Sequence, residues 1–511
     1  MVAKHSTIIR GIAAAGANAE FEGRFGRMFP GLKPGSYGST PEEEAQNLSK
    51  LASAMVSGFD PPKDGADDEE SGIPALYTYL GQFIDHDLTF DPDASFQKQK
   101  DPDATEDFRT PAFDLDNVYG RGPGDQPYMY DADQKTFLLG DPLFLGADGA
   151  RDLQRNAAGR ALIGDPRNDE NVIVSQLQGL FLRFHNRLVK NSASAQFPEI
   201  QEMMRFHYQY MVVNDFLPRI VNADVLSALK TGDHYDRTKL KFFTKFDEPF
   251  MPIEFSVAAY RLGHSMVRPG YRLNDATLMP IFPIPADIEP GFPEGLTGFR
   301  KMIANWGIDW GRFIDIDTRS YGSKTIDDAH KQQNFKRLQL AYRIDTALVD
   351  PLGTLPPAVV SNPPASLALR NLQRGRQFNL PTGQEVAGYM NAPVLDDEHI
   401  LIGQAIDNEP PQNIVEVAGP AFANNCPLWT YILAEAMQTL QNPAPIIPVT
   451  EPNLAINTPQ LGPVGGRIVA EVFLGLLFAD EGSYLSKDPL WQPPSGPSFQ
   501  LKDFVAMALQ P

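Results

Sequence analysis

Residues 77–90 place a histidine, two aspartates and a glutamine within a segment that is otherwise mostly apolar. The apolar side chains recur at helical spacing, which predicts a helix with one buried face. Gln82 and His86 are four residues apart and therefore project from the same side of that helix. Asp85 and Asp87 lie on either side of His86 and cannot serve the same partner, because each residue turns a helix by about 100°. Buried polar groups are costly unless something binds them, so the pattern indicates a bound group, with a solvated helix end as the simpler alternative.

The overall charge and the cysteine count exclude several classes of protein. The formal net charge of -20 over 511 residues argues against nucleic acid or an anionic membrane as a partner. The single cysteine, Cys426, excludes an intrachain disulfide. Residues 1–20 contain no continuous apolar stretch and no segment is long enough to cross a bilayer, so we expect no membrane span and no conventional signal peptide. The protein is expected to be cytoplasmic or to be exported by another route.

Apolar periodicity predicts helices along most of the chain. The clearest is at residues 171–189, where large apolar residues form one stripe. Further helices are expected at residues 198–221, 255–267, 328–346, 365–377, 428–440, 466–478 and 501–508. Strand signals are short and scattered, and the proline-rich loops mark no change of composition. We therefore predict a mainly α protein with one large helical domain at residues 71–511, and an N-terminal extension at residues 1–70 that packs on it.

Two of the eight histidines lie in apolar predicted helices beside unusual neighbours. They are His86 and His264, and the latter follows Gly263, whose missing side chain lets a bulky group approach the backbone. A lone histidine is more often a satisfied core residue than a ligand, and we assign His185 to that structural role. Two histidines on separate helices could instead hold one prosthetic group between them, as a proximal histidine and a distal pocket hold haem.

Oxygen-bearing groups form a second candidate site. The first helix and one loop offer oxygen ligands from Asp87, Thr110, the Ala112 carbonyl, Asp114 and Asp116. Within the loop these groups fall at alternate positions, a pattern that suits Ca²⁺, although acidic loops are more often only solvated. A non-haem metallohydrolase would need more histidines at close helical spacing, such as His-x-x-x-His, and the chain contains no such motif.

Six blocks of the chain, taken in order, resemble the animal-type haem peroxidases of the peroxidase–cyclooxygenase superfamily. They are Gly-Gln-Phe-Ile-Asp-His-Asp at residues 81–87 and the segments at residues 110–116, 164–170, 182–188, 261–264 and 371–376. The chain resembles a bacterial-type member of the family, without the disulfides of the secreted animal enzymes. The resemblance implies a single large helical haem peroxidase domain with few short strands and long loops.

The resemblance also implies roles for residues on the distal side of a haem. His86 would be the catalytic base, with Gln82 beside it and Arg167 as the distal arginine. Asp85 and Glu170 would form ester bonds to haem b. Each of these assignments is carried over from the motif that contains the residue.

On the proximal side, the resemblance implies that His264 ligates the haem iron and that Asn371 accepts a hydrogen bond from its imidazole. Arg261 and Arg374 would contact the cofactor. The implied Ca²⁺ ligands are Asp87, Thr110, Ala112, Asp114 and Asp116.

Two positions depart from better-known members of the family. Asn171 follows Glu170 where myeloperoxidase carries a methionine bonded to haem, so no sulfonium link is expected. Cyclooxygenases carry a radical tyrosine three residues before the proximal histidine, and here that position is Arg261, with Tyr260 one step away. The second departure weighs against fatty-acid oxygenation.

The resemblance implies a peroxidase that uses H2O2 to oxidise halides, thiocyanate or phenolic donors through a high-valent iron-oxo intermediate. Its expected partners are therefore H2O2 and a small reductant, and no oligomer is predicted. Three alternatives stay open: a fatty-acid dioxygenase of the same fold, a calcium-stabilised binding protein without catalysis, and the non-haem metallohydrolase.

Overall fold

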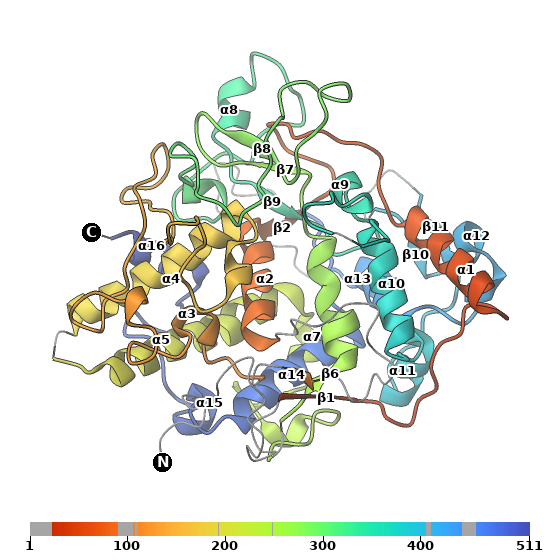
Figure 1. Ribbon diagram of the computed structural model, residues 1–511. Coiled ribbons are helices and arrows are strands. Elements are labelled where there is room, and N and C mark those ends of the chain that lie inside the picture. Colours follow the sequence, from red (N-terminus) through yellow and green to blue (C-terminus); the bar gives the residue numbers. More distant parts are fainter. Residues whose placement is uncertain are drawn as a thin grey trace.

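The computed structural model describes residues 23–89, 106–107, 111–192, 194–247, 249–360, 362–404, 410–441 and 456–510. The longer helices are α1 (Pro41–Ala54), α2 (Leu76–Leu88), α4 (Val172–Asn191), α5 (Phe197–Met211), α10 (Leu367–Gln377), α11 (Gly383–Met390), α13 (Leu428–Gln438), α14 (Gly465–Ala479) and α16 (Leu501–Leu509). The shorter ones are α3 (Asp116–Tyr119), α6 (Leu217–Ile220), α7 (Ala223–Ser227), α8 (Lys331–Phe335), α9 (Asp350–Gly353), α12 (Ile414–Ala418) and α15 (Tyr484–Lys487). Figure 1 shows α2 near the centre of the molecule, with α10 and α13 to its right.

Aromatic side chains pack the central helices together. Phe83 of α2 stacks on Phe181 of α4, with ring centroids 4.1 Å apart. Phe184, one turn further along α4, stacks on Phe504 of α16 at 4.4 Å. Stacked aromatic pairs of this kind add to the stabilisation that comes from burial alone. These stacks pack α2 against α4, and α4 against α16.

The strands are short and scattered along the chain, as the sequence predicted. The sheets pair β1 (Gly23–Gly26) with β3 (Glu106–Asp107) and β6 (Met251–Pro252), β2 (Glu70–Pro74) with β9 (Leu340–Tyr342), β4 (Lys230–Thr231) with β5 (His234–Tyr235), β7 (Gly270–Arg272) with β8 (Leu278–Pro280), and β10 (Leu401–Ile402) with β11 (Gln412–Asn413). Strand β2 leads directly into α2, and it pairs with β9 in antiparallel register, Glu70 opposite Tyr342. The fold class is therefore mainly α, as predicted.

The described part of the N-terminal segment packs on the core. Met28 and Phe29 are buried, and their backbone N–H groups donate to the Glu254 carboxylate at 3.0 and 3.2 Å. Strand β1 pairs in parallel with β6, and α1 contacts α10 and α12. A domain boundary at residue 70 stays a prediction.

Two helix predictions need correction. Residues 328–346 form only the short helix α8, followed by loop and by β9, because Arg337 and Gln339 turn inward to bond the backbone of neighbouring segments. The predicted helix at residues 255–267 is irregular: a π-helical turn, η7 (Glu254–Ala258), runs into a 3₁₀ helix, η8 (Ala259–His264). Such π-helical turns are frequent at functional sites.

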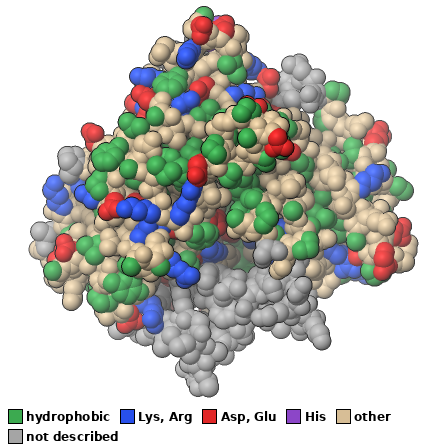
Figure 2. Space-filling view, turned by 45° about the horizontal axis from the view of Figure 1, so that its top comes forward, with side chains coloured by type: hydrophobic (Ala, Val, Ile, Leu, Met, Phe, Trp, Pro, Cys, Tyr) green, Lys and Arg blue, Asp and Glu red, His purple; other side chains and the backbone are tan. Residues whose placement is uncertain are grey.

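The remaining irregular turns are η3 (Pro127–Met129), η4 (Pro166–Asp169), η5 (Val212–Phe216), η6 (Arg237–Lys239), η9 (Trp310–Arg312) and η10 (Pro420–Phe422). None of the described helices has the length and apolar character needed to span a membrane. On the face shown in Figure 2, basic, acidic and hydrophobic side chains are interspersed.

Candidate functional site

Three residues on one side of α2 remain partly exposed to solvent, and the space that they border is called the opening below. Gly81, Gln82 and Asp85 are partly exposed, whereas most of the other residues of the helix are buried. Gly81 and Gln82 lie four and three residues before Asp85, and both spacings place residues on the same side of a helix. His86 lies beside these residues and is only 5% exposed.

A neighbouring amide determines which ring nitrogen of His86 carries the proton. Its Nδ1 lies 2.8 Å from Oδ1 of Asn168, whose Nδ2 donates to Gln178 Oε1 at 2.8 Å. An amide oxygen can only accept, so His86 donates from Nδ1 and leaves Nε2 free to accept a proton. Burial lowers the pKa of His86 to about 4, and the positive charge of Arg167 acts in the same direction. The ring is therefore neutral near pH 7.

Glu170 connects the histidine to Gln82. Its Oε1 lies 3.6 Å from Nε2 of His86 and accepts a hydrogen bond from Nε2 of Gln82. Asn171 in turn donates to Oε1 of Gln82 at 3.0 Å. Partial burial raises the pKa of Glu170 to about 7, against the opposing charge of Arg167. The prediction that Gln82 and His86 share one side of the helix is confirmed.

Arg167 lies close to the same cluster, but its guanidinium bonds to Asp165 and to carbonyl oxygens at the end of α2. Its Nη2 is 2.9 Å from Asp165 Oδ2 and donates to the carbonyl oxygens of His86, at 3.0 Å, and of Thr89. Carbonyl oxygens at a helix C-terminus carry partial negative charge, which favours a cation there. Asp165, which is fully buried, also caps η4 by accepting from the Arg167 N–H.

His264 ends the irregular η7–η8 segment. Nδ2 of Asn371, on α10, lies 2.8 Å from Nδ1 of His264. The sequence predicts that the Asn371 oxygen faces this imidazole; a half-turn of the amide would exchange its nitrogen for that oxygen. Burial lowers the pKa of His264 to about 3, with Arg261 adding to the effect. A neutral imidazole is the form that binds a metal.

An ion pair joins the two histidine-bearing segments. Nη1 of Arg261 lies 3.4 Å from Oδ2 of Asp85, and its Nε donates to the Ser256 carbonyl at 2.8 Å. The pKa of both His86 and His264 is lowered overall, and the negative charge of Asp85 opposes that lowering in each case. Both rings therefore lie near this one carboxylate. The two segments, distant in sequence, therefore border the same opening.

Two features of this opening suit a group that is not part of the chain. Oδ1 of Asp85 is buried and has no hydrogen-bond partner among the described residues. A Cβ built on Gly263 would meet nothing within 4 Å. An orphaned buried acceptor on one segment and open space at a glycine on the other both suit a ligand that supplies the missing contacts.

Other predicted site residues fall less clearly at the opening. Arg374 lies one helical turn after Asn371, and its guanidinium is 5.4 Å from the Phe378 ring, so its contact with a cofactor stays a prediction. His185 is structural as predicted: it is fully buried, with Tyr119 Oη and the Lys135 carbonyl at its two ring nitrogens.

A separate acidic cluster is formed by α2 and by the loop that leads into α3. Carboxylate oxygens of Asp87, Asp114 and Asp116 all lie within 4.8 Å of one another. The loop is shaped by Leu115, whose φ of 58° is left-handed, and whose N–H donates to Asp87 at 3.3 Å. The structure therefore brings together the three predicted aspartates. Ala112 is buried in the same loop, and Thr110 lies outside the described residues.

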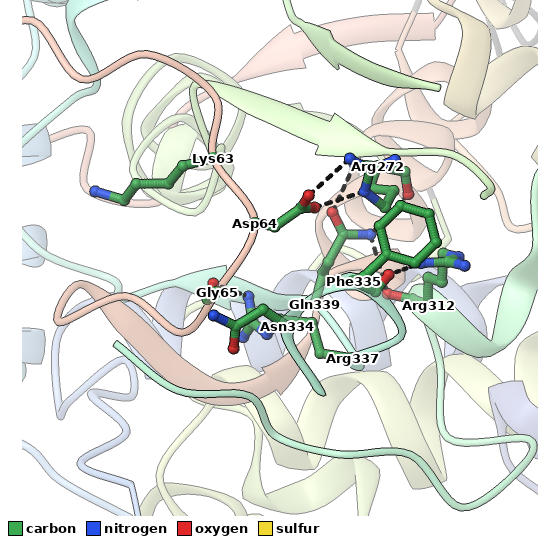
Figure 3. A pocket seen from close by; sticks show the side chains of 9 residues that line it. All are labelled: Lys63, Asp64, Gly65, Arg272, Arg312, Asn334, Phe335, Arg337 and Gln339. Carbon is green, nitrogen blue, oxygen red and sulfur yellow. Dashed lines mark hydrogen bonds and ion pairs between the residues drawn. The ribbon is translucent and has the colours of Figure 1, made fainter. Parts of the chain in front are cut away.

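Figure 3 shows a second polar region, in which Arg272 faces Asp64 and the Arg312 guanidinium bonds the Phe335 carbonyl. Arg337 also lines this region, and it pairs with buried Glu70 of β2 at 2.5 Å. The guanidinium groups there are paired, which indicates a structural network. Glu70 additionally binds Arg268, four residues after His264, so the network braces the strand that leads into α2 against the segment that follows His264.

Sequence reasoning missed Asn168 and Asp165. Both lie in the 164–170 block that carries the resemblance, and neither has a side-chain type that marks catalysis by itself. A pattern in which Asp165 precedes a proline does indicate the helical turn that places them.

Comparison with known proteins defines the class first: the fold is that of haem peroxidases and fatty acid dioxygenases. Peroxidase A from Dictyostelium discoideum matches over 96% of this chain and 94% of its own, with a TM-score of 0.58 and 13% identity. The fatty acid alpha-dioxygenase of Oryza sativa matches over 96% of this chain and 79% of its own, with a TM-score of 0.52 and 14% identity.

Sequence comparison then narrows the class. Residues 109–286 match the family model described as animal haem peroxidase. Peroxidasin of Drosophila melanogaster is 23% identical over 294 residues, 56% of this chain and 17% of its own length. Human thyroid peroxidase is 26% identical over 245 residues, 46% of this chain and 23% of its own. The matches span about a fifth of these two relatives. Over these residues the chain is similar to animal haem peroxidases, the family that its motifs resemble.

Proposed function

We propose that this protein is a haem peroxidase that uses H2O2 to oxidise small reductants. The observation that carries the proposal is the neutral His86, with its Nε2 available as an acceptor at the opening that His264 also borders. General bases need a free acceptor nitrogen at the pH of the reaction, and His86 meets that requirement.

The residues at the opening fit a haem. His264 would ligate the iron through Nε2, because Asn371 occupies the side of Nδ1. Asp85, with an orphaned oxygen, and Glu170 would form ester bonds to the haem. Haem, when bound, supplies the redox chemistry of peroxide cleavage.

The chain itself moves the proton. His86 Nε2 would take a proton from one oxygen of H2O2 and return it to the other, which would leave as water, while the bound haem would supply the two electrons and accept the remaining oxygen atom. Asn168 keeps the proton on Nδ1 and so keeps Nε2 available. Arg167 would stabilise negative charge on the leaving oxygen, provided that it turns from its bonds to Asp165 and the helix end.

Ca²⁺ is proposed to bind at Asp87, Asp114 and Asp116, with Thr110 and the Ala112 carbonyl completing the set. Three carboxylates in close proximity repel one another, and a divalent cation with oxygen ligands relieves that repulsion. Because Asp87 follows His86 directly, a cation there would fix the end of α2 that carries the base.

The second candidate function is fatty-acid dioxygenation, which the structural likeness to fatty acid alpha-dioxygenases favours. Against it, the tyrosine nearest to His264 in sequence, Tyr260, stacks on Phe255 at 4.8 Å within the core.

The test is expression with supplemented haem, followed by absorption spectra before and after H2O2. The expected result is a Soret band, H2O2-dependent oxidation of a phenol and of iodide, and haem that survives acidified organic extraction. Fatty-acid-dependent oxygen uptake without peroxide would favour the dioxygenase. Colourless protein that still binds Ca²⁺ would instead support the non-enzymatic alternative, and iron without porphyrin the metallohydrolase.

A further inference from the structure

The side chain of Asn171 serves two structural elements at once. Its Oδ1 accepts from the backbone N–H groups of Ile173 and Val174, at 3.1 and 2.9 Å, and so caps the N-terminus of α4. Its Nδ2 donates to Oε1 of Gln82 at 3.0 Å. Because the helix end offers only donors, the oxygen of Asn171 must face the helix and its nitrogen must face Gln82.

This fixed orientation is passed on to the next amide. Gln82 must present its oxygen to the Asn171 nitrogen, so its own Nε2 points the other way and donates to Oε1 of Glu170. The same Glu170 oxygen lies 3.6 Å from the Nε2 of His86. The helix cap of α4 and the catalytic histidine are therefore connected through two amides and one carboxylate.

We propose that Asn171 is a positioning residue that turns the Gln82 amide so that its N–H, and not its oxygen, faces Glu170 and His86. The significance for catalysis rests on the proposed function, whereas the orientation itself requires no haem. Without the Asn171 donor, Gln82 would be free to turn, and its oxygen could then lie against the carboxylate of Glu170.

The ionisation of Glu170 reports this orientation directly. A donor beside a carboxylate favours its charged form, and an acceptor beside it favours the neutral form. The hydrogen bond from Gln82 lowers the pKa of Glu170, which partial burial raises to about 7. The other charged or titratable groups near this carboxylate are Arg167, Asp165, Asp85 and His86.

The test uses haem-free protein and the variant Asn171→Ser. Serine caps a helix about as well as asparagine, so α4 is retained, but serine offers no amide donor to Gln82 and brings no charge. Infrared difference spectra between pH 5 and 9 follow the carboxylic acid band of Glu170, which Glu170→Gln identifies by its loss. We expect the midpoint to rise by about 0.7 pH unit, the equivalent of one neutral hydrogen bond.

The matched control is Asn413→Ser. Asn413 caps α12 by accepting from the N–H groups of Val415 and Glu416, as Asn171 caps α4. This control should leave the Glu170 midpoint unchanged. A second comparison repeats Asn171→Ser in a Gln82→Leu background, where no amide remains to be oriented and no further shift is expected.

An unchanged midpoint in Asn171→Ser would overturn the proposal, and so would an equal shift in the Gln82→Leu background. Should the serine variant fold poorly, Asn171→Asp keeps the cap, and its shift should be larger with Gln82 present than with Leu at that position. Because the readout needs no cofactor, a protein that fails to bind haem can still confirm or refute this role.

Discussion

Asp85 of α2 and Arg261 of η8 form an ion pair of 3.4 Å that links the helix that carries His86 to the segment that carries His264. Burial is the largest single influence on the pKa of Asp85 and would raise it, but the charges of Arg261, His86, Arg167 and His264 together outweigh burial and the net shift is downward. The carboxylate is therefore charged near pH 7. A haem esterified through Asp85 would be bonded to one of the two oxygens of this carboxylate.

Removing the proximal ligand should abolish haem retention. In His264→Ala no nitrogen remains to bind iron, so the Soret band should be lost, whereas Asn371→Leu should weaken haem affinity by about 10–100-fold because only the orientation of the ligand is lost. Haem titration followed by absorbance measures both. His399→Ala is the control, since His399 is 60% exposed and its side chain pairs with Asp396 at the surface. Full haem retention by His264→Ala would contradict the assignment.

Removing the distal base should leave haem in place and slow the reaction. His86→Ala is expected to lower the rate of peroxide-dependent oxidation by about 10²–10⁴-fold, the usual contribution of a general base. Asn168→Ala should give a smaller loss, because the ring remains but its Nδ1 proton is no longer held. Stopped-flow absorbance at the Soret band measures the peroxide step, and equal rates in His86→Ala and the parent would exclude this role.

Chelation should destabilise the protein through the aspartate cluster. A site filled at 100 times its Kd stabilises the folded state by about 2.7 kcal/mol, so excess EDTA should lower the thermal midpoint. Asp114→Asn should remove most of that difference. The control Asp141→Asn alters an aspartate that is 67% exposed and should respond to EDTA as the parent does. Terbium luminescence provides an independent measure of occupancy.

Stability should fall as the pH rises through the titration of Glu435. This buried residue of α13 accepts from the N–H groups of Val464 and Gly465, yet burial raises its pKa from 4.5 to about 7. Between these values the folded state binds more protons than the unfolded state, so this contribution to stability is fully present below about pH 4.5 and is lost as the pH rises through about 7.

The corresponding loss is of the order of 3 kcal/mol. Urea denaturation at pH 5 and pH 8 measures it, and the comparison with Glu435→Gln isolates this residue from other titrations. In the variant the difference between the two pH values should be smaller. An identical difference in both proteins would show that Glu435 does not titrate in this range.

Helical periodicity in the sequence was enough to place α2 and α4, but it did not predict the irregular form of the segment that carries His264. The helix predicted at residues 171–189 is α4, Val172–Asn191, and the shared side of Gln82 and His86 followed from their spacing. Periodicity fails where polar side chains fix the backbone, as Arg337 does within the segment wrongly predicted as one helix. The amide contacts of Asn168 and Asn171 depend on which loops meet, which no local pattern in one sequence reveals.

The 3₁₀ geometry of η8 sets a fixed spacing on the proximal side. With three residues per turn, Arg261 and His264 point in the same direction, and Tyr260 points about 120° away, toward Phe255. One inserted residue between positions 261 and 264 would rotate the guanidinium out of reach of Asp85. Replacement of Arg261 by tyrosine, by contrast, would keep the chain length and would place a phenol where the guanidinium now lies.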